Sequence, residues 1–262
     1  MTEIAERPHF LLCNDDGFRA PGIQELAQAL RPLGEITIVA PEGPRSGYSS
    51  AISTTLPLRL KPRVQEEGFT VYSVEGTPVD CVKLALYTIF SEELPTIVIS
   101  GINHGSNDGV CVHYSGTIGA AREACIQGVP ALAVSLDDTA ERPNFSEVIA
   151  YTLSVVHHIL EQGMPSGQFL SLNVPKSKPL GLKVCPQAVS RFVDEFMPSK
   201  NARGHNVYWM QGYQHLPKPQ EQPTDVELLR QGYATITPLM LDQTDYATLA
   251  KLAKVESSLE RK

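Results

Sequence analysis

Two adjacent carboxylates follow an apolar run near the start of the sequence. In "FLLCNDDGFRAPGIQELAQAL" the run 10–13 stops at Asn14, Asp15, Asp16 and Gly17. Asp-Gly is common in hairpin turns, but no second strand follows here. Two carboxylates this close need a cation beside them, because their like charges otherwise raise the pKa of one of them.

The residues after the acidic loop predict a helix. Ile23, Leu26, Ala27 and Leu30 recur at helical spacing, and Pro21 suits a first helical turn. The unit is therefore strand, acidic loop and helix. In an open α/β sheet such a loop lies at the carboxyl edge, where ligands bind.

Further oxygen donors follow other predicted strands. Ser46 lies in the loop after the strand 35–41, and Asn103 follows the apolar strand "PTIVISG". In a parallel sheet these loops open on the same edge as Asp15 and Asp16, so the four side chains can meet. Carboxylate, hydroxyl and amide oxygens suit Mg²⁺, Mn²⁺ or Ca²⁺ better than a thiolate zinc site.

The segment "YSGTIGAA" places Ser115, Gly116 and Thr117 at the start of a predicted helix. Free N–H groups and the positive end of the helix dipole can hold a phosphate there. Taken alone, the segment is better explained as an ordinary capped helix. Beside an acidic metal loop, phosphate binding becomes the favoured interpretation.

Three basic side chains stay open to two interpretations. His104 and His113 lie in the active loops, where either could protonate a leaving oxygen. A solvated loop histidine is the more common case for each. Arg45, next to Ser46, suits a phosphate contact and an ordinary surface position equally well.

Strands and helices alternate through about Pro175, which predicts a three-layer, doubly wound, mostly parallel α/β sheet. We expect residues 1–178 to form this catalytic core. Short strands without long helices follow, then the amphipathic stretch "DQTDYATLAKLAKVES". This tail is not expected to extend a parallel sheet. We predict that residues 179–262 form a β-hairpin extension with a terminal helix, an arm that packs on another subunit.

Composition limits the classes of partner. The 262 residues carry a net charge of -7, with pI near 5.5 and no basic stripe, which argues against binding a nucleic-acid polymer. The first ten residues include acidic side chains and no apolar h-region, and no apolar run reaches membrane-spanning length. The 5 cysteines are scattered, as in reduced thiols. We expect a cytoplasmic protein without a membrane partner.

The ordered motifs "NDDG", "AP...RSG", "GTPVDCV", "SGIN.G" and "YSGT.GAA" resemble the SurE family of stationary-phase survival proteins. "QGYATITPL" resembles that family's tail. The resemblance implies a Rossmann-like core and a C-terminal arm that mediates homodimers or homotetramers. It also implies one divalent cation per subunit, Mg²⁺ or Mn²⁺, held by Asp15, Asp16, Ser46 and Asn103.

The function that the resemblance implies is metal-dependent hydrolysis of nucleoside 5'- and 3'-monophosphates. Asp15 and Asp16 would be catalytic, with Asp16 both binding metal and orienting water. Phosphate would meet Asn14, Ser46, Asn103 and the helix start 115–117. Alternatives are an exopolyphosphatase or general acid phosphatase, and a non-catalytic metal- or nucleotide-binding assembly protein. A dinucleotide-binding oxidoreductase is disfavoured, because N-D-D-G replaces G-x-G-x-x-G after the first strand.

Overall fold

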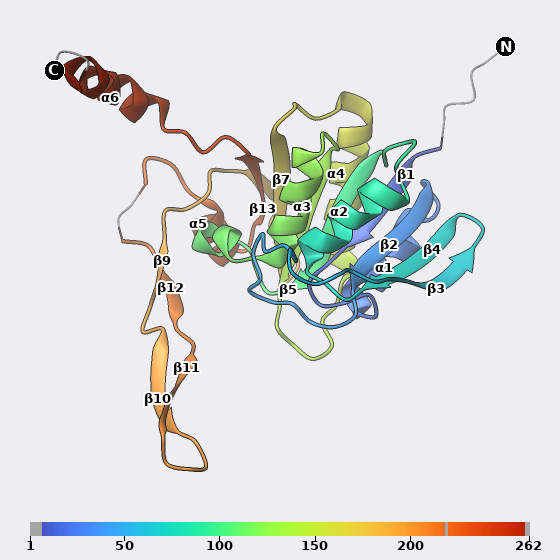
Figure 1. Ribbon diagram of the computed structural model, residues 1–262, viewed down its shortest axis with the longest axis horizontal. Coiled ribbons are helices and arrows are strands. Elements are labelled where there is room, and N and C mark those ends of the chain that lie inside the picture. Colours follow the sequence, from blue (N-terminus) through green and yellow to red (C-terminus); the bar gives the residue numbers. More distant parts are fainter. Residues whose placement is uncertain (1–6, 218–219, 260–262) are drawn as a thin grey trace.

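A computed structural model describes residues 7–217 and 220–259 of the chain, and nine strands in these ranges form one large sheet (Figure 1). Its strand order is β3-β4-β2-β1-β5-β6-β7-β13-β8. The strands are, in chain order, β1 (His9–Cys13), β2 (Glu35–Pro41), β3 (Leu60–Glu66), β4 (Phe69–Val74), β5 (Ile97–His104), β6 (Ala131–Asp137), β7 (Gln168–Pro175), β8 (Leu182–Val184) and β13 (Ala234–Met240).

Helices connect and cover these strands. They are α1 (Pro21–Leu30), α2 (Pro78–Thr88), the 3-10 helix η1 (Gly109–His113), α3 (Gly116–Ile126), α4 (Ser146–Gln162), α5 (Asp225–Arg230) and α6 (Tyr246–Leu259). Side chains of α1 and α4 join one buried apolar cluster, and those of α2 and α3 join another. The predicted three-layer, doubly wound α/β core is confirmed.

The six central strands, from β4 to β7, run parallel. The chain builds the sheet outward from β1 through β2 to β4, then returns to place β5 on the other side of β1. The strand order therefore reverses between β1 and β5. In open α/β sheets, the crevice outside the carboxyl ends of two such strands is the usual ligand site.

Local signals explain how several helices begin. Thr77 accepts a hydrogen bond from the Asp80 backbone N–H (3.1 Å), while the Asp80 side chain accepts from Thr77 N (2.9 Å), with Pro78 in the first turn. This capping box makes Thr77 the N-cap of α2. At the start of α4, Asn144 Oδ1 accepts a hydrogen bond from Ser146 N at 2.9 Å.

The expectation that the tail cannot extend the sheet is wrong. β13 pairs antiparallel with β7 from Thr235 to Met240, and β8 pairs parallel with β13. β3, which the sequence did not reveal, adds an antiparallel edge strand beside β4. Antiparallel pairing needs no crossover helix, so a strand can join this sheet without a helical connection. The sheet thus crosses residue 178, and the division into core and arm remains a prediction.

The remaining tail forms an arm that projects from the core (Figure 1). Its hairpin has two ladders, which pair β9 (Arg191–Val193) with β12 (Tyr213–His215) and β10 (Phe196–Lys200) with β11 (Asn206–Met210). Helix α6 also extends away from the core, after β13, in a different direction from the hairpin (Figure 1). Residues 1–6 and 260–262 lie outside the described part of the chain. The expectation that the first ten residues are not a signal segment therefore falls mostly on residues that the structure does not describe. No helix in the described ranges has the length and apolar character needed to cross a membrane.

The pairing of β13 predicts how truncations behave. A chain ending at Leu241 keeps β13 and should unfold in one cooperative thermal transition. A chain ending at Pro198 lacks β13, whose Ala234 and Thr235 are fully buried, and exposes one side of β7. We expect it to lose cooperative unfolding, as monitored by circular dichroism and calorimetry. A sharp transition in the shorter chain would contradict this account of the sheet.

Candidate active site

A cavity of about 600 Å³ lies at the carboxyl edge of the sheet, where the loops after β1, β2 and β5 meet the start of α3. Asp15, Ser46, Asn103 and Ser115 all line it. Four segments that are far apart in the sequence thus come together there. Asp16 is not one of the lining residues, although its neighbour in space, His104, is.

Asp15 is 3% exposed and is held by the start of α3. Thr117 Oγ1 donates to Asp15 Oδ1 at 2.7 Å. Burial raises the pKa of Asp15 to about 6, the Thr117 hydrogen bond opposes this rise, and the charge of Asp16 adds to it. A Cβ on Gly116 would lie 3.0 Å from Asp15 Cβ, so a glycine there lets the helix approach the carboxylate.

Asp16 carries a buried oxygen without a protein partner. Its Oδ2 accepts no hydrogen bond from the described residues. Burial raises the pKa of Asp16, while the charge of His104 and a backbone hydrogen bond from His104 lower it. An unsatisfied buried carboxylate oxygen is costly, which makes Asp16 Oδ2 a suitable ligand for a cation.

The two neutral donors differ in how they are held. Asn103 Nδ2 donates to the Gly105 carbonyl at 2.7 Å, so the amide oxygen lies on the opposite side of the group from this anchor. Ser46 is exposed on its loop, which is fastened to the acidic loop because Arg45 N donates to the Asp15 carbonyl at 2.6 Å.

The donor set fits a hard divalent cation. Among residues 7–217 and 220–259, no group of three or more His, Cys, Asp or Glu side chains is arranged to hold a metal ion. A cation here would therefore need neutral oxygens besides the two carboxylates, and Ser46 and Asn103 could supply them. Such an all-oxygen set is typical of Mg²⁺ and Mn²⁺ sites.

The structure shows which of the predicted phosphate-binding residues face the cavity and which are bonded to other parts of the chain. Both polar atoms of the buried Asn14 amide bond to the Gly17 backbone, at 3.0 and 3.1 Å, so Asn14 shapes the loop rather than facing the cavity. Thr117 is committed to Asp15, and Ser115 Oγ caps α3 by accepting from Ile118 N at 3.1 Å. Of the predicted helix start, Ser115 lines the cavity and Gly116 lies against Asp15.

The sequence from residue 10 to residue 194 matches the family described as "Survival protein SurE". The chain belongs to the SurE family. A 5'-nucleotidase SurE from Porphyromonas gingivalis is 55% identical over 251 residues, which cover 96% of this chain and 97% of that protein. One from Phocaeicola vulgatus is 40% identical over 248 residues, covering 94% and 96%.

A solved SurE structure has the same fold. The crystal structure of the SurE protein from Aquifex aeolicus matches with a TM-score of 0.81 at 33% identity, and the match covers 95% of this chain and 100% of that chain. The family resemblance inferred from the ordered motifs is thereby confirmed.

Two of the three basic residues considered above, Arg45 and His113, do not line the cavity that contains Asp15. Arg45 donates to the carbonyls of Gly76 and Pro44, both at 3.3 Å, and does not line the cavity. His113 lines a different cavity, whereas His104 lines the one that contains Asp15.

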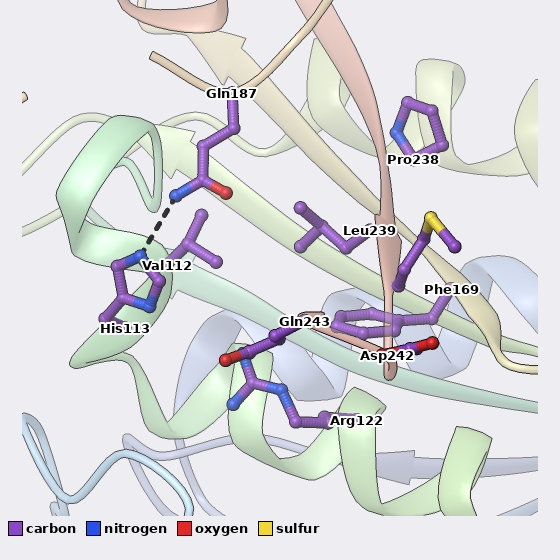
Figure 2. A pocket seen from close by; sticks show the side chains of 10 residues that line it. Val112, His113, Arg122, Phe169, Gln187, Pro238, Leu239, Asp242 and Gln243 are labelled. Carbon is purple, nitrogen blue, oxygen red and sulfur yellow. Dashed lines mark hydrogen bonds between the residues drawn. The ribbon is translucent and has the colours of Figure 1, made fainter. Parts of the chain in front are cut away.

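The second cavity, of about 370 Å³, lies between α3, η1 and β13 (Figure 2). His113, Arg122 and Phe169 are on its walls, and Arg122 stacks over Phe169 at 5.8 Å from the ring centre. Arg122 lines this cavity and not the one that contains Asp15.

The arm also contributes residues to the cavity that contains Asp15, which the sequence did not reveal. Residues of the η1 loop and of the hairpin line it together with the predicted donors: Ser106, Asn107, Cys111, Tyr114, Phe192, Glu195, Met210, Gln211 and Gly212. The polar residues of "HGSNDGVCVH" were a partial signal. No local pattern could relate the hairpin to a loop so distant in the chain.

A buried acidic pair joins the η1 loop to the C-terminal segment. Asp225 accepts hydrogen bonds from the backbone N–H of Gly109 (2.9 Å) and Ala188 (2.8 Å). Burial, together with the charge of Asp225, raises the pKa of Asp108 to about 6. Asp108 keeps one side-chain hydrogen bond, from Ser106 Oγ at 3.0 Å.

This raised pKa predicts a pH-dependent stability. The folded chain favours protonated Asp108, so its stabilising contribution is complete below the ordinary pKa of 3.8 and is lost as pH rises to about 6. Asp108→Asn mimics the neutral form. We expect it to raise the free energy of unfolding at pH 7.5 by on the order of 2 kcal/mol, with a smaller gain at pH 4.5. Denaturant titrations at both pH values measure this, and an equal effect at both would refute it.

Proposed function

We propose that this SurE-family chain is a divalent-metal-dependent 5'-nucleotidase that hydrolyses nucleoside monophosphates to nucleoside and phosphate. The observation that carries the proposal is the meeting of Asp15, Ser46 and Asn103 in one cavity, beside the unpartnered oxygen of Asp16. The relatives named 5'-nucleotidase SurE support the same activity.

The proposed metal ligands are Asp15, Asp16, Ser46 and Asn103, with Mg²⁺ or Mn²⁺ as the cation. When bound, the cation would supply the positive charge that screens a phosphate as its ester bond breaks. Thr117 and Gly116 position Asp15 by a hydrogen bond and by close approach of the helix. Asn103 presents its amide oxygen because its Nδ2 is anchored to Gly105.

Hydrolysis also requires an oriented water molecule and a proton for the leaving oxygen. We assign Asp16 to orient the water, since its Oδ2 has no other partner in the described residues. Water attacks phosphorus, the phosphorus–ester oxygen bond breaks, and the ester oxygen takes up a proton. His104 lines the cavity and its Nε2 is unpaired within the described part of the chain, so we assign it to donate that proton.

Removing the charge of Asp16 tests the proposal. Asp16→Asn keeps the side-chain shape and should lower kcat/KM for AMP by at least about 100-fold. The matched control Asp138→Asn changes a carboxylate that does not line the cavity and accepts a hydrogen bond from the nearby Ala140 N, so it should leave activity unchanged. Phosphate release with Mg²⁺, Mn²⁺ and EDTA is the readout. Wild-type protein that releases no phosphate from any nucleotide with either metal would instead support a non-catalytic binding protein.

We propose that the arm joins subunits into a homodimer or homotetramer. Tyr246, Leu249 and Leu252 recur every third residue on α6 and are 54–64% exposed. Apolar side chains gathered on one side of a projecting helix are typical of a subunit contact.

Charge on this helix face should separate the subunits. Leu249→Glu together with Leu252→Glu is expected to lower the mass measured by light scattering, while Ala247→Glu, on the opposite side of α6, should not. The thermal unfolding transition of the core should persist in both variants. An unchanged mass in the double variant would reject this interface.

The cysteines support a reducing compartment, and we propose the cytoplasm. All five thiols are free, and four of them are buried: Cys13, Cys81, Cys125 and Cys185. Such thiols serve as core residues and not as disulfide partners.

A further inference from the structure

The cavity that contains Asp15 and Ser115 has a second wall, which the C-terminal arm contributes. This arm wall consists of Phe192, Glu195, Met210, Gln211 and Gly212. The same chain therefore supplies both the acidic edge of the sheet and the surface that encloses the space in front of it.

The arm wall lies at the junction of the two hairpin ladders, where its backbone is tightly constrained. Gln211 N donates to the Glu195 carbonyl at 2.7 Å. Gly212 has φ +124, and a Cβ there would lie 2.6 Å from the Val193 carbonyl oxygen. A residue without a Cβ is needed at this position for the chain to pass so close to Val193. The path of the backbone through the arm wall is therefore fixed.

The hairpin is also fastened to the loop that carries the catalytic cavity. Val110 N donates to Ser190 Oγ at 2.8 Å, and Gln214 Nε2 donates to the Asp108 carbonyl at 3.1 Å. Gly109 fits between these partners, since a Cβ on it would lie 2.2 Å from Gln214 Nε2. The arm wall is thus held at a fixed position beside η1.

The chemistry of the two walls differs along the cavity. The sheet edge offers carboxylate, hydroxyl and amide oxygens, which suit a metal and a phosphate. The arm wall offers the ring of Phe192 and the thioether of Met210, with Glu195 and Gln211 as polar neighbours. A substrate whose phosphate lies at the sheet edge extends its other end toward these apolar groups.

We propose that the arm wall is the nucleobase subsite, in which Phe192 and Met210 contact the face of the base. This inference rests on the proposed nucleotidase function. It gives the arm a role in substrate binding within its own subunit, apart from any role in assembly. Phe192 and Met210 are specificity-determining residues, and they take no part in the chemistry at phosphorus.

The test compares AMP with ribose 5-phosphate, which has the same phosphate ester but no base. The double variant Phe192→Ala, Met210→Ala should raise KM for AMP by about tenfold, as expected for the loss of base stacking. Its kcat/KM for ribose 5-phosphate should change by less than about twofold. The matched control is Trp209→Ala, which alters an exposed neighbour on β11 that does not line the cavity.

Each result has a distinct meaning. A selective loss for AMP, absent in Trp209→Ala, supports the subsite. Equal losses for both substrates, or an equal loss in the control, would overturn it. Wild-type enzyme that hydrolyses AMP no better than ribose 5-phosphate would also overturn it. Wild-type protein that hydrolyses neither substrate would overturn the proposed function itself.

Discussion

A carboxylate buried where the sheet reverses its strand order is the constraint on which this site depends. Asp15 is almost without solvent, and its pKa rises to about 6 because burial disfavours its charge. Burying a charge is tolerated only with compensating donors or cations. Thr117 supplies one donor, and the proposed cation would supply further compensation for the buried charge.

Close backbone approach brings the other loops to this carboxylate. Arg45 N bonds to the Asp15 carbonyl, and Ser49 N bonds to the Tyr114 carbonyl at 3.0 Å. A Cβ on Gly119 would lie 2.2 Å from the Ser49 carbonyl oxygen. The loop that carries Ser46 is therefore tied to the acidic loop on one side and to the start of α3 on the other.

The C-terminal segment serves the core in two ways. β13 completes the sheet beside β7, and Asp225 ties the segment to the η1 loop through Gly109. The hairpin that leaves from this anchored region then forms one wall of the cavity. Because sheet, loop and arm share these contacts, a change in the arm's position would alter the space available to the substrate.

The sequence by itself determined the alternation of strands and helices and the oxygen donors Asp15, Asp16 and Ser46 that follow β1 and β2, whereas Asn103, expected just after its strand, lies within the end of β5. These features depend on neighbouring residues, on periodicity and on the rule that parallel strands end at one edge. Only the tertiary structure decided that β13 joins the sheet, that Thr117 serves Asp15, and that the hairpin faces the cavity. Those contacts join segments far apart in the chain, and no local spacing encodes which distant partner a short strand or a buried hydroxyl will find.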